Sequence, residues 1–175
     1  MKMLFALVRG SRISDKQLSK TLGMSQTTTT RRRQELEKEG YIREYTLIPD
    51  FNKIGIEIVA FIFGYADASE LTPERMAEAR EWLSEQPEVL CNIEGQGLDS
   101  NFVQISVHKN YESYLEFLRR IRGEPLRSGH ISGIFAISTG KTDLILKAFS
   151  LRQIESLLLP PEINRPRLES KKARR

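Results

Sequence analysis

Cysteine and long apolar runs are the scarcest features of this 175-residue sequence. Its one cysteine, Cys91, excludes an intramolecular disulfide and suits a reducing compartment. A small buried side chain explains it more simply than a reactive thiol does. The longest apolar stretch, residues 58–63, is far shorter than the ~20 residues that cross a bilayer, and the apolar start is too short for a signal peptide. We therefore expect a cytoplasmic protein with no membrane partner.

Side chains that usually carry catalysis or bind metal are also few. The two histidines, His108 and His130, lie at the end of one expected strand and the start of another. The sequence shows no Ser/His/Asp or Cys/His arrangement, no metal-ligand spacing and no phosphate-cradling loop. We expect no catalytic residues, no metal and no cofactor, and hence a protein that is not an enzyme.

Charge is distributed unevenly along the chain. Residues 1–49 hold 10 basic and 5 acidic side chains, residues 50–164 hold 11 and 17, and residues 165–175 hold 6 and 1. Basic N-terminal and C-terminal segments on either side of an acidic central segment indicate that only part of the molecule faces a polyanion. DNA-binding modules are often joined to sensing or assembly domains in this way.

The first 40 residues have the start and stop signals of short helices. Ser14 is an expected N-cap, and Gln17 completes a capping box three residues later. That helix ends at Gly23, and Ser25 caps a second helix over residues 26–39. Two helices joined by so short a turn are typical of a helix-turn-helix.

Flanking segments complete this unit. A shorter helix around residues 4–8 precedes the pair, and residues 41–48 alternate apolar and polar side chains as a strand does. The order helix, helix, turn, helix, strand predicts a winged helix-turn-helix DNA-binding domain over residues 1–49.

Beyond a linker at residues 50–55 the pattern changes to alternating strands and helices. The order predicts a βαββαβ ferredoxin-like domain, so the whole chain is of the α+β class. One face of such a sheet lacks helices, and we expect a homodimer or a higher homo-oligomer to cover it. The expected strands are 56–65, 89–94, 101–109 and 130–138, and the expected helices are 72–85 and 111–122.

Two further elements are expected to extend this sensing and oligomerisation domain to residue 159. Residues 143–149 have the pattern of an extra strand, and residues 150–159 that of a short helix. The tail, residues 160–175, is rich in proline and basic residues, which predicts disorder. Its charge serves either non-specific phosphate attraction or solubility.

The second helix of the pair is the expected reader of DNA. Its inner face is set by Leu36, so the opposite face is free to enter a major groove. Arginine recognises guanine, glutamine recognises adenine, and threonine offers a hydroxyl or a methyl group. A merely solvated polar face is the plainer alternative. The expected contacts of the helix are Gln26, Thr27, Thr28, Thr30, Arg31 and Gln34, and the expected phosphate contacts are Lys16, Lys20, Arg32 and Arg43.

One position conflicts with a packed helix pair. Arg33 lies on the inner face, where an apolar residue is expected. We predict that its stem lies along the edge of the core, that its guanidinium reaches solvent, and that the domain is loosely packed.

Several short runs of the sequence match one known family in residue type and spacing. These are Arg12-Ile13-Ser14, Leu18-Ser19, Leu22-Gly23-Met24-Ser25, Arg32, Leu36-Glu37, Gly40-Tyr41-Ile42 and residues 110–118. Over about residues 10–140 the sequence thus resembles the Lrp/AsnC family of transcription regulators. The resemblance implies dimers, often octamers, and an amino-acid effector bound between subunits.

The family's effector loop is typically a glycine followed closely by an aspartate between two strands. The nearest equivalent here is Gly97-Leu98-Asp99-Ser100, preceded by Gly95. A carboxylate beside glycine backbone would hold an ammonium group, and free N–H groups would hold a carboxylate. A hairpin turn explains the same residues more simply.

Two other functions compete with a regulator. Sirohaem decarboxylases resemble this two-domain layout but rely on histidine and basic residues around a tetrapyrrole, and the setting of His108 and His130 does not suggest one. The other alternative is an assembly or ligand-binding protein that has lost DNA binding. Salt-dependent binding to DNA distinguishes the regulator from both.

Overall fold

The computed structural model describes residues 2–123, 128–141, 147, 149–154 and 157. The chain divides into two compact units. One holds the residues up to Ile48 together with the described residues from Lys147 onward, and the other begins at Pro49. Described residues near position 150 therefore group with the first unit, and not with the second, where the sequence analysis placed them.

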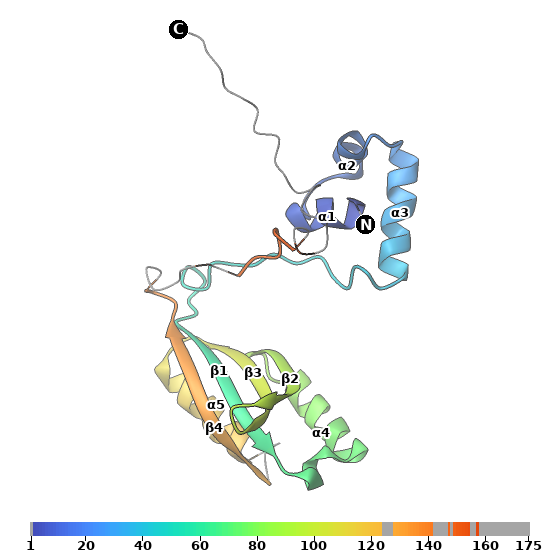
Figure 1. The fold of residues 1–175 in the computed structure, drawn as a ribbon. Helices are drawn as coiled ribbons and strands as arrows, with labels where there is room; N and C mark the ends of the chain where they lie inside the picture. Colours follow the sequence, from blue (N-terminus) through green and yellow to red (C-terminus); the bar gives the residue numbers. More distant parts are fainter. Residues whose placement is uncertain (1, 124–127, 142–146, 148, 155–156, 158–175) are drawn as a thin grey trace. The chain divides into compact units, whose positions relative to one another are not determined.

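The first unit contains the expected helices: α1 (Lys2–Arg9), α2 (Asp15–Leu22) and α3 (Gln26–Lys38) (Figure 1). Ser14 caps α2 in the predicted capping box, with its Oγ accepting from the Gln17 backbone N–H at 3.3 Å. Gly23 ends α2 with a φ of 64°, in the left-handed region that favours glycine. Ser25 then caps α3 by accepting from the Thr28 backbone N–H at 3.1 Å. These caps set the turn of a helix-turn-helix.

A small apolar core holds these helices together. Met3 and Leu7 of α1 pack against Leu18 of α2, and all three are buried. Leu36 of α3 and Ile42, beyond it, cover this cluster. The core fixes which side of α3 faces inward.

The strand predicted over residues 41–48 is absent from the structure, so this prediction was wrong. The segment is irregular, and Leu47 and Ile48 are exposed. A lone strand gains little without a neighbour to complete its hydrogen bonds, and no described strand pairs with this segment. Its backbone is instead tied to α3, because the Ile42 N–H donates to the Leu36 carbonyl oxygen at 3.1 Å.

The second unit has the predicted βαββαβ order. Its sheet has the order β2-β3-β1-β4 with every neighbouring pair antiparallel. This is the α+β, ferredoxin-like arrangement that the sequence predicted. The elements are β1 (Ile58–Ala66), a short helix η1 (Ala68–Leu71), α4 (Pro73–Ser84), β2 (Val89–Gly97), β3 (Ser100–His108), α5 (Tyr111–Gly123) and β4 (Gly129–Ser138).

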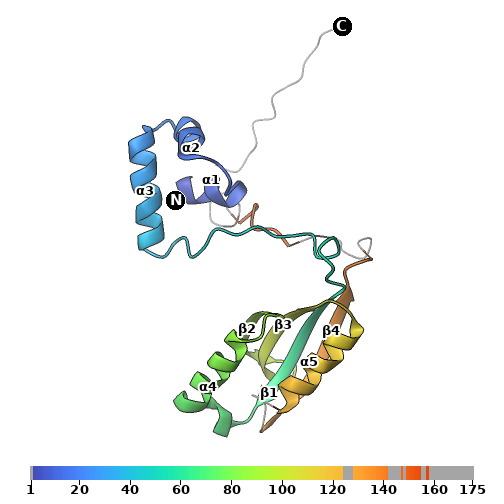
Figure 2. The ribbon, with the colours of Figure 1, turned by 180° about the vertical axis from the view of Figure 1, so that it is seen from behind.

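Both helices of this unit lie against the same face of the sheet (Figure 2). The core beneath them joins Ala60 and Ile62 of β1 to Phe117 and Ile121 of α5. Trp82 of α4 packs at its margin. The helices therefore bury one face of the sheet.

The other face carries no described helix of this unit, and we name it the open sheet face (Figure 2). The strand register places Phe61 between Ile105 and Phe135, with the rings of Phe61 and Phe135 6.4 Å apart. Such a contiguous apolar surface is typical of an interaction site. Its apolar residues are Val59, Phe61, Phe63, Ile93, Val103, Ile105, Phe135 and Ile137.

Beneath α5 the sheet carries a buried histidine. His108 is enclosed by the rings of Tyr114 and Phe117, and its Nε2 lies 2.9 Å from Ser106 Oγ. Burial lowers the pKa of His108, while Glu88 opposes this shift. His108 is thus a structural, uncharged residue of the core.

The buried His108 makes the second unit sensitive to acid. Because its pKa is lower in the folded chain than in the unfolded chain, the unfolded chain binds more protons below a pH of about 6.5. We expect the free energy of unfolding to be constant above this pH and to decrease below it. Denaturant unfolding between pH 8 and pH 5 measures this slope, and His108→Leu is expected to reduce it. An equal slope in the variant would assign the effect to other groups.

Several predictions lie wholly or partly outside the described residues. The expected strand at 143–149 lies partly outside the described residues, and the expected tail at 160–175 lies wholly outside them. Of the expected helix at 150–159, the described part forms a turn in which the Ile154 N–H donates to Leu151 O at 3.0 Å. No helix in the described part of the chain is long and apolar enough to cross a membrane.

Candidate nucleic-acid interface

The structure gives α3 a buried side and a free side. Thr29 faces inward with no exposure, and its hydroxyl donates to the Ser25 carbonyl oxygen at 3.0 Å. On the free side, the predicted reading residues line a shallow hollow along the helix. These are Gln26, Thr27, Thr30, Arg31 and Gln34. The sequence therefore predicted correctly which side of α3 is exposed to solvent.

Arg31 is the most prominent cation on this side. Its side chain is 76% exposed and makes one ion pair along the helix, with Nε 3.3 Å from Glu35 Oε1. An exposed pair at i, i+4 contributes only about 0.3–0.5 kcal/mol. The guanidinium can therefore leave Glu35 for a base edge at little cost.

Two of the predicted threonines already have partners within the protein. Thr28 Oγ1 lies 2.8 Å from the Oγ of Ser25, as part of the cap. Thr30 Oγ1 donates to Asp15 Oδ2 at 2.7 Å and is half-buried. The hydroxyl proton of Thr30 is thus occupied, which leaves mainly its methyl group for recognition.

The predicted phosphate contacts are exposed side chains of the two helices and of the segment just beyond them. Lys16 and Lys20 of α2 are exposed, as is Arg43 just beyond α3. Arg32 is also exposed, and its Nη1 lies 3.9 Å from Met24 Sδ. Long exposed cations on and near a reading helix are suited to phosphates.

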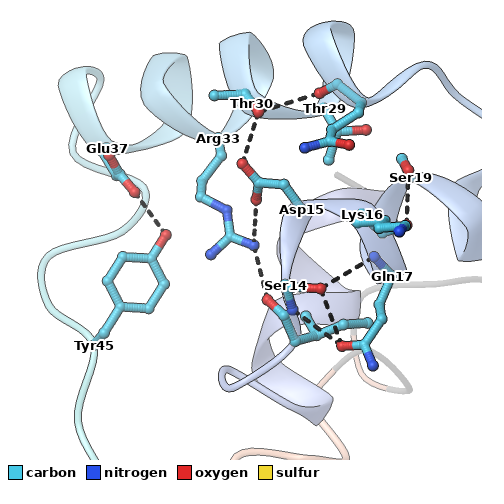
Figure 3. Close-up of polar contacts among 12 residues, drawn as sticks. Ser14, Asp15, Lys16, Gln17, Ser19, Thr29, Thr30, Arg33, Glu37 and Tyr45 are labelled. Carbon is cyan, nitrogen blue, oxygen red and sulfur yellow. Dashed lines mark hydrogen bonds and ion pairs between the residues drawn. The ribbon is translucent and has the colours of Figure 1, made fainter.

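A charged cluster joins α2 to α3, as Figure 3 shows. Asp15, in the first turn of α2, accepts from Thr30 with one oxygen and pairs with Arg33 Nη2 at 2.8 Å with the other. The same Arg33 nitrogen donates to the Ile13 carbonyl oxygen at 3.1 Å. Asp15 therefore fixes the two helices relative to one another, a role that we did not predict from the sequence.

The prediction that the Arg33 guanidinium reaches solvent was wrong. Its side chain is only 17% exposed, because Asp15 holds the charged group at the helix interface. The ring of Tyr45 lies 5.8 Å from the guanidinium carbon. A charge on an inner helix face needs a partner to offset its desolvation, and here that partner is an acid 18 residues earlier in the chain.

Tyr45 closes the other end of this cluster (Figure 3). Its hydroxyl donates to Glu37 Oε1 at 2.7 Å. Burial, with this hydrogen bond, raises the pKa of Tyr45. Tyr45 thus stays a neutral donor and ties the segment after α3 back onto the helix.

Comparison with known proteins identifies the family. A model of winged helix-turn-helix DNA-binding domains matches residues 1–43. An HTH-type transcriptional regulator of Pyrococcus furiosus is 30% identical over 117 residues, which are 67% of this chain and 75% of that protein. The Bkd operon transcriptional regulator of Pseudomonas aeruginosa is 28% identical over 118 residues, again 67% and 75%.

Solved structures agree in fold. An AsnC family transcriptional regulator from Agrobacterium tumefaciens has a TM-score of 0.67 at 22% identity, over 86% of this chain and 91% of that one. A transcriptional regulator of Neisseria meningitidis in complex with L-Met has a TM-score of 0.69 at 18% identity, over 90% and 96%. The chain belongs to the Lrp/AsnC family of transcriptional regulators. As an Lrp/AsnC-type protein it is a DNA-binding regulator, and its named relatives lend no support to the sirohaem decarboxylase alternative.

The segment expected to resemble the Lrp/AsnC effector loop is shorter than we predicted. β2 continues through Gly95 to Gly97, so only Leu98 and Asp99 connect it to β3. Both connecting residues have a positive φ, of 53° and 51°, as a two-residue type I′ hairpin turn requires. The turn is held from β4, where Ser132 Oγ donates to the Asp99 carbonyl oxygen at 2.8 Å. The hairpin alternative is therefore correct for the backbone, and Ser100 begins the next strand.

Proposed function

We propose that the free side of α3 reads base edges in the major groove. The observation that carries this proposal is the hollow formed by Gln26, Thr27, Thr30, Arg31 and Gln34 on a capped helix whose opposite side is buried. Arg31 is the residue best placed to hold guanine, because it is a cation that lines this hollow and its side chain is 76% exposed. Thr28 lies beside the hollow and approaches the backbone of the duplex.

The four exposed cations around the helix would hold the phosphates. Lys16 and Lys20 approach one strand from α2, and Arg32 and Arg43 approach the other from α3 and beyond. These contacts fix the position of the protein but carry no sequence information. They are expected to make binding steeply dependent on salt.

We propose further that the protein is a homodimer that pairs through the open sheet face. This face is apolar over β1, β3 and β4, and Phe135 on it is 64% exposed. A symmetric pair of such faces would form a buried core between two subunits. Two subunits present two α3 helices to half-sites about one helical turn apart, or a multiple of it.

Since the ligand is chromosomal DNA, we place the protein in the cytoplasm and assign it binding, not catalysis.

We also propose that an amino acid modulates this regulator at the hairpin formed by Gly95, Gly97, Leu98, Asp99 and Ser100. The support is the Neisseria meningitidis relative, which was solved with L-Met. The exposed Asp99 carboxylate would hold the ammonium group, and a second subunit would complete the site, because Leu98 and Asp99 are exposed in a single chain.

The test of the reading helix is Arg31→Ala. We expect this variant to lose about 1–3 kcal/mol of binding to the preferred site, about 10- to 100-fold, and to relax preference at one base position. The measurement is a gel-shift titration with duplexes that the wild-type protein selects from a random pool, compared with an unselected duplex.

Two matched variants control this experiment. Lys20→Ala should weaken binding to both duplexes equally and reduce the salt slope by about one. Glu35→Ala removes the ion-pair partner of Arg31 but not Arg31 itself, so affinity should not fall. Equal losses for Arg31→Ala on both duplexes would contradict base reading by Arg31, and weak binding that does not change with salt would contradict the whole surface.

A further inference from the structure

The second unit contains a cavity between α4 and the helix-facing side of the sheet. Its volume is about 390 Å³ among the described residues. That volume lies within the range of about 300–1,000 Å³ typical of small-molecule sites. The cavity lies on the opposite side of the sheet from the open sheet face, and neither DNA binding nor dimerisation uses it.

The cavity exists because α4 packs loosely. No residue of α4 is buried, whereas α5 buries four side chains in the core. Ala79 of α4 presents only a methyl group to the gap, and Leu83 and Met76 line it on either side. On the sheet, Phe102 forms a wall by lying over Gly64, where a Cβ would overlap its ring. The resulting space is lined mainly by apolar side chains.

One polar group on the sheet side of this space lacks a partner. Gln104 has no exposure, and its Oε1 accepts from Asn92 Nδ2 at 3.1 Å. Its Nε2 is buried and donates to no acceptor in the described part of the chain. A buried donor without an acceptor is unfavourable, and native proteins seldom keep one. A ligand oxygen in the cavity would provide the acceptor.

The charges at the lining favour an anion. Arg75 and Arg80 contribute from α4, and Glu94 contributes from β2. Arg75 is paired with Glu78, so Arg80 is the cation that can compensate a ligand. An ammonium group could pair with Glu94, but it would leave the buried Gln104 donor without an acceptor.

We propose that this cavity binds a small apolar carboxylic acid. The carboxylate accepts a hydrogen bond from Gln104 Nε2, Arg80 compensates its charge, and the hydrocarbon chain fills the gap beneath α4. Binding would tighten the contact of α4 with the sheet.

Sodium octanoate is the probe, and octylamine, with the same chain but a cationic head, is its control. Trp82 on α4 is the only tryptophan of the chain, so its fluorescence reports binding to the full-length protein. We expect octanoate to bind saturably and octylamine to bind at least about 10-fold more weakly. Calorimetry gives the stoichiometry.

Three variants locate the site. Gln104→Leu removes the donor without changing the bulk greatly and should weaken octanoate about 10-fold. Ala79→Leu fills the cavity and should prevent binding, while thermal unfolding shows that both variants remain folded. Asp99→Ala changes the hairpin and should leave octanoate binding unchanged. Absence of saturable binding, equal binding of octanoate and octylamine, or binding that is insensitive to both cavity variants would each overturn the proposal.

Discussion

Phe135→Asp is expected to convert the proposed dimer to a monomer. Phe135 lies in the open sheet face beside Phe61 and is 64% exposed in a single chain, so its loss should cost the folded subunit little. In a symmetric dimer the new carboxylates would be buried near one another, which costs several kcal/mol. We expect the dissociation constant of the dimer to rise about 100-fold or more. Sedimentation velocity over a range of concentrations measures it.

Tyr111→Asp provides the matched control. Tyr111 is an aromatic residue that is also 64% exposed in the same unit, but it begins α5 on the covered side of the sheet. This variant should remain dimeric. DNA affinity should fall in Phe135→Asp alone, because each half-site is then bound independently. A wild-type monomer, or a Phe135→Asp variant that dimerises as tightly as Tyr111→Asp, would contradict the proposed interface.

Asp15→Ala is expected to destabilise the helix-turn-helix by about 2–3 kcal/mol. It removes the partner of Arg33, whose guanidinium is largely buried, and it also removes the acceptor for Thr30. Leaving a buried charge unpaired costs more than the pair itself contributes. The first unit is small, and small units have little stability to lose. Denaturant unfolding followed by circular dichroism measures the change.

A double-mutant cycle tests the cause. Arg33→Met removes the charge, so adding it to Asp15→Ala should recover much of the lost stability. Glu35→Ala breaks the exposed ion pair between Glu35, whose side chain is 52% exposed, and Arg31. This variant should lower the free energy of unfolding by less than about 0.5 kcal/mol. If Asp15→Ala cost no more than Glu35→Ala, the cluster would not hold α2 and α3 together.

Local signals predicted the helices well. The caps at Ser14 and Ser25 and the stop at Gly23 act within one helical turn, so the sequence alone locates them. The order of strands and helices beyond residue 55 likewise predicted the sheet, because βαββαβ is the order of a ferredoxin-like domain. The free side of α3 followed from the position of Leu36 on the helix.

Features that depend on distant residues could not be predicted in the same way. Residues 41–48 alternate as a strand does, but alternation does not provide a neighbouring strand. The hairpin at Leu98 and Asp99 was expected to be longer, since two glycines suggested a loop where β2 in fact continues. The cavity beneath α4 depends on how closely a helix approaches the sheet, which no local pattern reports.

Arg33 is the instructive case. An arginine on an inner helix face indicates that an acid must lie nearby, and Asp15 is the only acidic residue that precedes α3 in the sequence. The sequence therefore contained a signal for the pair, although we assigned the guanidinium to solvent. The ion pair between Arg33 and Asp15 follows from the need of an inward-facing charge for an acidic partner.

The attachment of Tyr45 to α3 limits how far each DNA-binding unit can move from the second unit along this connection. Tyr45 bonds to Glu37 of α3, and Pro49 begins the second unit. Four peptide steps separate them, which span at most about 14 Å when fully extended. A dimer built on these connections would accept small changes in the spacer between its binding sites, of a few base pairs, but not a spacer lengthened by half a turn of DNA, which would place one site on the far side of the duplex.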